Sequence, residues 1–138
     1  MGPAVSYDID EIRIALNNRR GKWGHPYRFV FLNACFSGQD DLATAFGIDT
    51  KPFTLAHYAN KGMKGLAYIG AIDDVILPSR QDEIVQHALA LAIFWSEWMA
   101  NVDVTTALQD GKDRANSTSP IDPAFRVSGA TDLRRFGP

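Results

Sequence analysis

Two stretches of the chain are almost continuously apolar. Residues 27–34 read YRFVFLNA, and residues 66–72 read LAYIGAI. Runs of this length are typical of parallel strands that helices cover on both faces, and the first run suits a central strand. Between them lie two segments with helical features, residues 40–46 and 53–60. A strand, a helical region and a second strand in this order predict a βαβ unit with parallel strands.

The N-terminal part of the chain carries the signals of a helix start. Asp8 can act as an N-cap, and Glu11 stands three residues later, as in a capping box. The apolar residues that follow fall on one helical face: Ile9, Ile12 and Leu16. Residues 17–25 contain two glycines and are predicted to form a turn.

The longest amphipathic segment is residues 79–99. Ser79 with Asp82 three residues later is a variant of the capping box. Apolar residues cover more than one stripe of this helix, which predicts that it is heavily buried. Its aromatic residues, Phe94, Trp95 and Trp98, are interpreted as core packing rather than as a ligand site.

Two more elements are predicted after the long helix. Asp103 is placed to cap a helix over residues 104–115. Residues 116–123 read NSTSPIDP and are predicted to be irregular, and residues 124–128 form a short last strand. The whole pattern predicts an α/β fold with a mainly parallel sheet and helices on both faces.

Composition narrows the function classes. The chain has 138 residues, which fits one domain, and 14 basic against 16 acidic residues give a net charge of −2. That balance argues against nucleic-acid binding. The N-terminus lacks the features of a signal peptide and no apolar run approaches the roughly 20 residues of a membrane span, so a cytoplasmic protein without membrane contact is expected. The three histidines are far apart in the sequence, so no metal site is predicted.

Cys35 is the only cysteine, and it stands where the first apolar strand ends. Residues 28–38 read RFVFLNACFSG. An inert cysteine behaves as a small hydrophobic residue and needs no particular setting. A nucleophile needs a rigid strand that aims it and a turn that opens the backbone around it. Ser37 and Gly38 supply turn residues directly after Cys35, which favours the nucleophile.

This segment resembles the nucleophile segment of the caspase-like cysteine peptidases of clan CD, which include caspases, gingipains, separases, metacaspases and bacterial CHAT domains. The shared pattern is an apolar strand, a small residue, Cys, any residue, a small residue and Gly, and residues 31–38 meet it throughout. Weaker similarities follow in the right order as far as the last strand and its turn, residues 125–133. The resemblance spans about residues 5–135 and is closest to the CHAT and gingipain types.

The resemblance implies a partial caspase-like three-layer fold, in which residues 1–138 form the C-terminal half of one incomplete domain. It implies that Cys35 lies at the carboxyl end of its strand, adjacent to the strand at residues 66–72. The implied reaction is hydrolysis of a peptide bond by the Cys35 thiolate, with a histidine as general base and backbone N–H groups at the oxyanion, and without a cofactor.

The resemblance also assigns the residues that contact the substrate. These are Asn33, Ser37, Gly38, Asp73 and Asp74. Several relatives that cleave after basic residues carry an acidic residue where this chain has Asn33. Negative charge for a basic substrate residue would therefore come from Asp73 or Asp74.

The histidine of the family lies upstream of the nucleophile, about 50 residues away in caspases, and only 34 residues precede Cys35 here. His25 enters the same strand from its far end, about 25 Å from the thiol if the chain is extended. His57 and His87 lie on predicted helices, where surface or packing roles are expected. The general base is therefore expected to come from outside this chain.

Three accounts of the missing histidine stay open: a piece of a longer protein, a processed subunit, or a degenerate member that binds without cutting. The expected partners are a peptide or protein substrate and, along the open edge of the strand at residues 27–34, an upstream portion of the same protein or a second copy. The alternatives to an enzyme are a non-catalytic interaction module of caspase-like fold and a generic α/β domain with an inert cysteine.

Overall fold

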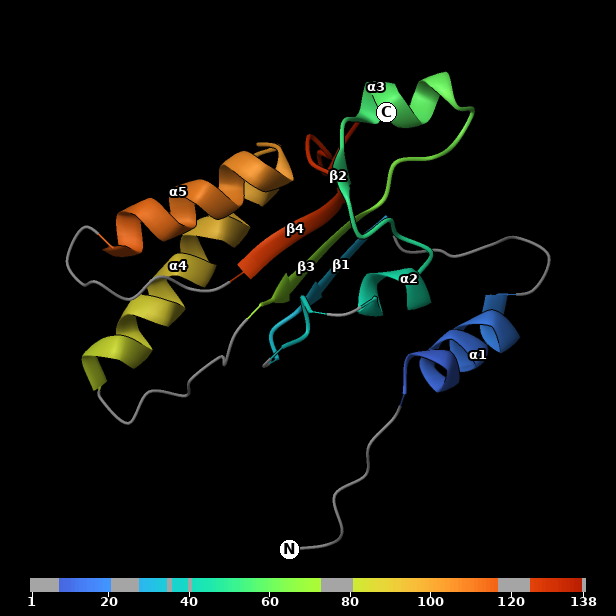
Figure 1. The fold of residues 1–138 in the computed structure, drawn as a ribbon. Helices are drawn as coiled ribbons and strands as arrows, with labels where there is room; N and C mark the ends of the chain where they lie inside the picture. Colours follow the sequence, from blue (N-terminus) through green and yellow to red (C-terminus); the bar gives the residue numbers. More distant parts are fainter. Residues whose placement is uncertain are drawn as a thin grey trace, which may run out of the picture.

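A computed structural model describes residues 8–20, 28–34, 36–39, 41–72, 81–116 and 125–137. Figure 1 shows the elements in their chain order, which are α1 (Ile9–Arg20), β1 (Phe29–Leu32), α2 (Leu42–Ala45), β2 (Pro52–Phe53), α3 (Leu55–Asn60), β3 (Ala67–Ala71), α4 (Gln81–Met99), α5 (Val104–Asn116) and β4 (Phe125–Ala130). The α/β class predicted from the sequence is confirmed.

The strands form one mixed sheet in the order β1-β3-β4-β2. β1 runs parallel to β3, with Phe29 opposite Ala67 and Leu32 opposite Gly70, as the sequence predicts. β2 is parallel to β4, but β4 is antiparallel to β3. The α4–α5 hairpin causes this reversal, because it returns the chain to the carboxyl end of β3 before β4 begins.

β1 is an edge strand of the described sheet, not the central strand that its apolar sequence predicts. Its only neighbour among the described strands is β3. Its apolar residues are still needed, because side chains from both faces of β1 pack into the two cores. The apolar pattern thus indicates that both faces of the strand are covered. It does not indicate how many strands lie beside it.

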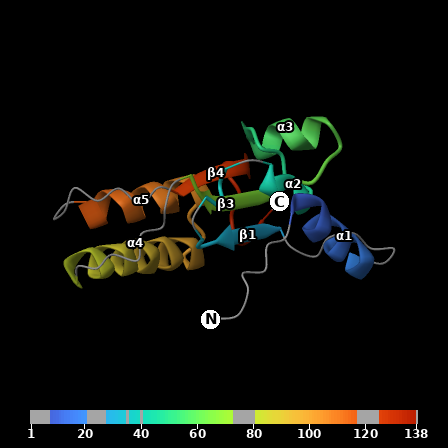
Figure 2. The same cartoon turned by 60° about the horizontal axis from the view of Figure 1, so that its bottom comes forward.

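Helices cover both faces of the sheet (Figures 1 and 2). The larger core lies between the sheet and the α4–α5 pair and includes Ile69, Phe94 and Phe125. The smaller core lies on the face of α2 and includes Ala43, Ile48 and Tyr68. Alternate residues of β3 therefore point to opposite cores, as the pleat of a strand requires.

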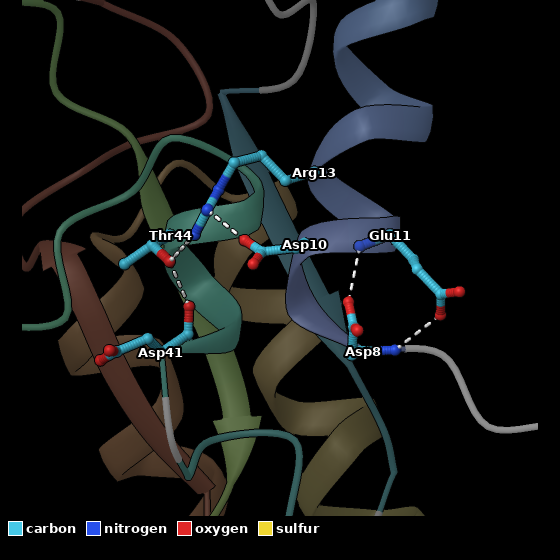
Figure 3. Close-up of polar contacts among 6 residues, drawn as sticks. All are labelled: Asp8, Asp10, Glu11, Arg13, Asp41 and Thr44. Atoms are coloured by element: carbon cyan, nitrogen blue, oxygen red, sulfur yellow. Dashed lines mark hydrogen bonds and ion pairs between the residues drawn. The ribbon is translucent and has the colours of Figure 1, made fainter.

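The capping box predicted at the start of α1 is confirmed (Figure 3). The Glu11 N–H donates to Asp8 Oδ1 at 2.7 Å, and the Asp8 N–H donates to Glu11 Oε2 at 3.0 Å. One turn later Arg13 pairs with Asp10 and donates to Thr44 Oγ1 at 3.1 Å. Since Thr44 belongs to α2, Arg13 connects the two helices on this face of the sheet.

Two helix boundaries differ from the prediction. α1 continues to Arg20 through residues expected to form a turn. Pro52–Phe53 is a short strand rather than the start of a helix, and α3 begins after Thr54, whose Oγ1 accepts from the His57 N–H at 3.3 Å. Phe53 pairs with Ala130 of β4. The two residues are far apart in the sequence, so the local pattern around Phe53 does not predict this strand.

α4 is less buried than its pattern predicts, so the prediction of a heavily buried helix is wrong. Phe94 and Trp98 face the core. Five large apolar side chains of α4 are between 41% and 55% exposed: Ile84, Val85, Leu89, Trp95 and Met99. We call this set the outer face of α4. The helix packs on the sheet and α5 along one side, which leaves this set about half exposed.

The outer face of α4 adjoins the open edge of β1. The Trp95 ring lies 6.1 Å from the Phe29 ring and 5.6 Å from the Phe31 ring. Trp95 therefore packs on β1 with part of its ring, and 42% of the residue stays exposed. The core role expected for Trp95 is thus confirmed only in part. In the part of the chain that the structure describes, no helix is long and apolar enough to cross a membrane.

Candidate functional site

The turn at residues 36–39 follows β1 and lies against the carboxyl end of β3. The Gly38 N–H donates to the Ala71 carbonyl oxygen at 2.6 Å. The Gln39 side-chain amide donates to the Ile72 carbonyl oxygen at 2.5 Å. These two bonds fix the turn to the neighbouring parallel strand, at the sheet edge where α/β proteins bind ligands. Cys35 itself, like Asp73 and Asp74, lies outside the described residues.

Ser37 joins the ends of β1 and β3. Its hydroxyl donates to the Leu32 carbonyl oxygen at 2.9 Å and accepts from the Ala71 N–H at 3.0 Å. The side chain thereby extends the hydrogen bonding of the two strands beyond the last backbone pair, and only 5% of the residue is exposed. Ser37, the small residue of the nucleophile segment, thus links β1 to β3.

Gly38 and Gly70 bring the turn and β3 into backbone contact. A Cβ on Gly70 would stand 2.5 Å from the Ser37 oxygen and 2.6 Å from the Gly38 nitrogen, and a Cβ on Gly38 would collide with the Gly70 carbonyl. On the same face of β3, the Tyr68 hydroxyl donates to the Ser37 carbonyl oxygen. Burial raises the pKa of Tyr68 to about 12, so the hydroxyl remains a donor at neutral pH.

The residue after Cys35 has a strained backbone. Phe36 has φ 56°, in the left-handed region, and its side chain is 46% exposed. A bulky residue in this region costs about 1–2 kcal/mol. Strain of this kind persists where the surroundings enforce it, and it is common at functional sites. The bonds of Ser37 and Gly38 to β3 supply that enforcement.

The N–H groups of the turn are already engaged. Ser37 N–H donates to the Ala34 oxygen at 3.2 Å, Gly38 N–H to Ala71, and Gln39 N–H to the Phe36 oxygen at 3.0 Å. An oxyanion at this turn therefore cannot use these three groups without breaking a bond. Of the substrate-contacting residues assigned by resemblance, Asn33 is exposed beside the turn, whereas Ser37 and Gly38 are buried and hold the turn in place.

Arg126 is a residue of the site that the sequence reasoning missed. Its Nη2 donates to the Gly38 carbonyl oxygen at 2.5 Å. Arg126 lies opposite Gly70 in the β3–β4 register, so its side chain crosses a position without a side chain to reach the turn. The sequence feature that could have indicated its role is that Arg126 is the one charged residue inside the last strand, FRVSGA.

The two described histidines lie away from the turn. His57 stacks on Phe53 with ring centroids 4.1 Å apart, and Figure 1 shows α3 at the opposite end of the sheet from the tips of β1 and β3. The length of β3 alone separates these ends by about 13 Å. His57 therefore lies too far from the turn at residues 36–39 to act as a base there.

His87 is at the correct end of the sheet but on the other face. Its ring, on α4, lies 5.8 Å from that of Phe125, which belongs to the larger core between the sheet and the α4–α5 pair. The turn lies on the face of Tyr68 and α2, so the sheet separates the two. Burial lowers the pKa of His87, and its Nε2 is buried without a hydrogen-bond partner among the described residues.

The described side chains contain no group of three His, Cys, Asp or Glu residues that could hold a metal ion. Comparison of the chain with family models, with curated proteins and with solved structures gives no match.

Proposed function

We propose that Cys35 is the nucleophile of a caspase-like cysteine endopeptidase and that the general-base histidine comes from outside this chain. The observation that carries the proposal is the fixation of the turn after Cys35. Ser37 and the contact between Gly38 and Gly70 hold this turn against the carboxyl end of the neighbouring parallel strand. A nucleophile needs its backbone held in this way by rigid elements.

In the proposed reaction, the thiol proton passes to the histidine of the partner segment, and the thiolate attacks the carbonyl carbon of the peptide bond. The tetrahedral intermediate collapses, the C–N bond breaks, and the leaving amine takes the proton from the imidazolium. A water molecule then hydrolyses the thioester, which releases the carboxylic acid and restores the thiol. Because the N–H groups of residues 37–39 are engaged, the partner segment or the backbone at residues 35 and 36 supplies the oxyanion donors.

The positions of His57 and His87 support a base from outside. One lies at the far end of the sheet and the other beneath its opposite face. The open edge of β1 supports a partner at the same place, because an unpaired strand edge accepts a further strand. The outer face of α4 continues this surface. The partner that supplies the histidine is, in this proposal, an upstream portion of the same protein, and either that portion or a second copy covers the edge of β1.

The test is cleavage of a mixed peptide library. The 138-residue chain alone should show no turnover above background, since general-base assistance contributes about 10² to 10⁴ in rate. The same chain expressed with its upstream genomic sequence should cleave peptides, and Cys35→Ala should abolish this. Ser96→Ala, on an exposed position of α4, is the matched control. Cleavage that survives Cys35→Ala would overturn the proposal.

A non-catalytic interaction module is the second candidate, and the outer face of α4 is the observation that favours it. A large exposed apolar surface marks an interaction site regardless of catalysis. The two candidates differ in the experiment above. An interaction module binds its partner through α4 and β1 but gains no peptidase activity from it.

A further inference from the structure

We infer that the outer face of α4 is the interface of a symmetric homodimer, in which α4 packs antiparallel on the α4 of a second copy around Ala92. This inference goes beyond the reaction proposed for Cys35 and does not depend on it. It assigns the outer face of α4 to a second copy of this chain and leaves the edge of β1 free for the strand expected there.

The outer face of α4 lacks the charge of a solvated helix surface. From Ile84 to Ser96 the sequence contains no Asp, Glu, Lys or Arg, although the five side chains of the face are 41% to 55% exposed. The neighbouring helix α5 has the ordinary polar surface, since its exposed residues include Gln109, Asp113 and Arg114. An exposed apolar surface of this kind marks an interface, and within the hairpin it is α4 that is suited to a partner.

The exposed residues of α4 repeat with the spacing of a seam between two helices. Val85, Ala92 and Met99 are seven residues apart, and Ala88 and Trp95 each stand three residues after one of them. This is the heptad spacing of helices that pack side by side along their length. All five residues are exposed, so the seam lies on the open side of α4.

This face is complementary to itself about Ala92. Val85 lies seven residues before Ala92 and Met99 seven residues after it, while Leu89 and Trp95 lie three residues before and after it. In an antiparallel pair with Ala92 at the two-fold axis, Val85 of each copy therefore meets Met99 of the other, and Leu89 meets Trp95. Since Ala92 carries only a methyl group, the helix axes can approach to about 8 Å, the short end of helix packing distances. Such an interface is isologous, as in most homodimers.

The two ends of the seam carry opposite charge. Residues 80–83 read RQDE, with one basic and two acidic side chains, and Asp82 is exposed. At the other end Arg134 Nη1 donates to the Asn101 carbonyl oxygen at 2.8 Å, so Arg134 and Arg135, both exposed, lie at the end of α4. Asp82 and Asn101 are nearly equidistant from the two-fold axis in sequence. An antiparallel pair thus places the acidic end of one helix beside the arginines of the other, whereas a parallel pair would place like charges together.

The first test uses a substitution that makes the surface more apolar. Ala92→Phe adds a ring at an exposed position, so it should not disturb the core of the monomer. If two α4 helices approach closely at Ala92, the ring holds them apart, and the dimer dissociation constant from sedimentation equilibrium should rise about tenfold or more. Non-specific apolar association would instead become tighter. Ala15→Phe, at an exposed position of α1, is the matched control and should leave the dissociation constant unchanged.

The second test measures the register by cross-linking in a Cys35→Ser background, which removes the only cysteine. Ala92→Cys should form a disulfide-linked dimer under a mild oxidant, because two Cα atoms at the axis lie within the roughly 4–7 Å that a disulfide spans. Ser96→Cys, also exposed, is the control. Four residues from the axis, its two copies are about 12 Å apart along the helices, so it should not cross-link.

Three results would overturn the inference. A parent chain that is monomeric at every concentration would leave the face without a second copy. Cross-linking of Ser96→Cys as fast as Ala92→Cys would show a parallel or unordered contact. If the chain joined to its upstream genomic sequence loses both the dimer and the Ala92→Cys cross-link, the upstream segment is the occupant of the outer face of α4.

Discussion

The backbones of Gly38 and Gly70 lie in direct contact, so neither position has room for a Cβ. One glycine belongs to the turn after Cys35 and the other to the strand beside it. At the same place the Ser37 hydroxyl donates to the Leu32 carbonyl oxygen and accepts from the Ala71 N–H. Arg126 of β4 donates to the Gly38 carbonyl oxygen. The turn is therefore part of the sheet rather than a surface loop.

Gly70→Ala should displace the turn and destabilise the protein by about 1–3 kcal/mol, the usual cost of overpacking, because the atoms it meets are backbone and cannot rotate away. It should also change the alkylation rate of Cys35. Gly62→Ala is the control. Gly62 has φ 67° and open space around it, so the variant loses about 1–2 kcal/mol through its backbone and leaves Cys35 unaffected. Urea unfolding and iodoacetamide kinetics measure the two effects.

Ser37→Ala should cost about 2 kcal/mol or more in the free energy of unfolding, since it leaves the Leu32 carbonyl and the Ala71 N–H without their partner, and an unsatisfied buried group costs about 1–3 kcal/mol. The exposed control Ser96→Ala should stay within about 0.5 kcal/mol of the parent. A Ser37→Ala variant as stable as Ser96→Ala would show that the hydroxyl does not hold the strands.

Local features of the fold were predictable from the sequence. The capping box of Asp8 and Glu11 spans three residues, and its hydrogen bonds form as expected. The parallel pairing of β1 with β3 follows from two apolar runs separated by a helical region. In both cases the information lies in neighbouring residues or in the order of elements.

Features that depend on distant partners were not predictable. Arg126 contacts Gly38 across 88 residues of sequence, and Phe53 forms a strand because Ala130 pairs with it. The apolar pattern of α4 indicates which side chains avoid water but not whether this chain covers them. The side chains of the outer face, such as Val85, are therefore exposed although the pattern predicts burial.

The outer face of α4 and the open edge of β1 should make the isolated chain self-associate. Val85→Glu and Met99→Glu, each at a side chain 55% exposed, should shift sedimentation velocity profiles towards monomer at the same concentration, because a charge opposes burial of this surface. Ile14→Glu on α1, at 58% exposure, is the control and should leave association unchanged. A parent chain that is a stable monomer at all concentrations would contradict the proposed partner surface.

His87 should make stability fall on acidification. Burial lowers its pKa in the folded state, so the unfolded chain binds more protons as the pH falls below the ordinary pKa of about 6.5. Stability therefore rises with pH through this window and levels off above it. His87→Gln should flatten the urea midpoint between about pH 5 and 7, whereas the exposed, non-titrating change Gln81→Leu should keep the slope of the parent. An unchanged slope in His87→Gln would contradict the assignment.

The pH profile of Cys35 alkylation tests the central claim most directly. With the base outside this chain, the rate of reaction with iodoacetamide in the isolated protein should follow a thiol pKa near the ordinary 8.5 or so. Joining the upstream genomic sequence should lower that pKa, because an imidazolium beside the thiolate stabilises its charge. A strongly depressed pKa in the isolated chain would contradict the account, since it requires a base within these 138 residues. An unchanged pKa in the longer protein would equally contradict it, because Cys35 would then lack a general base altogether.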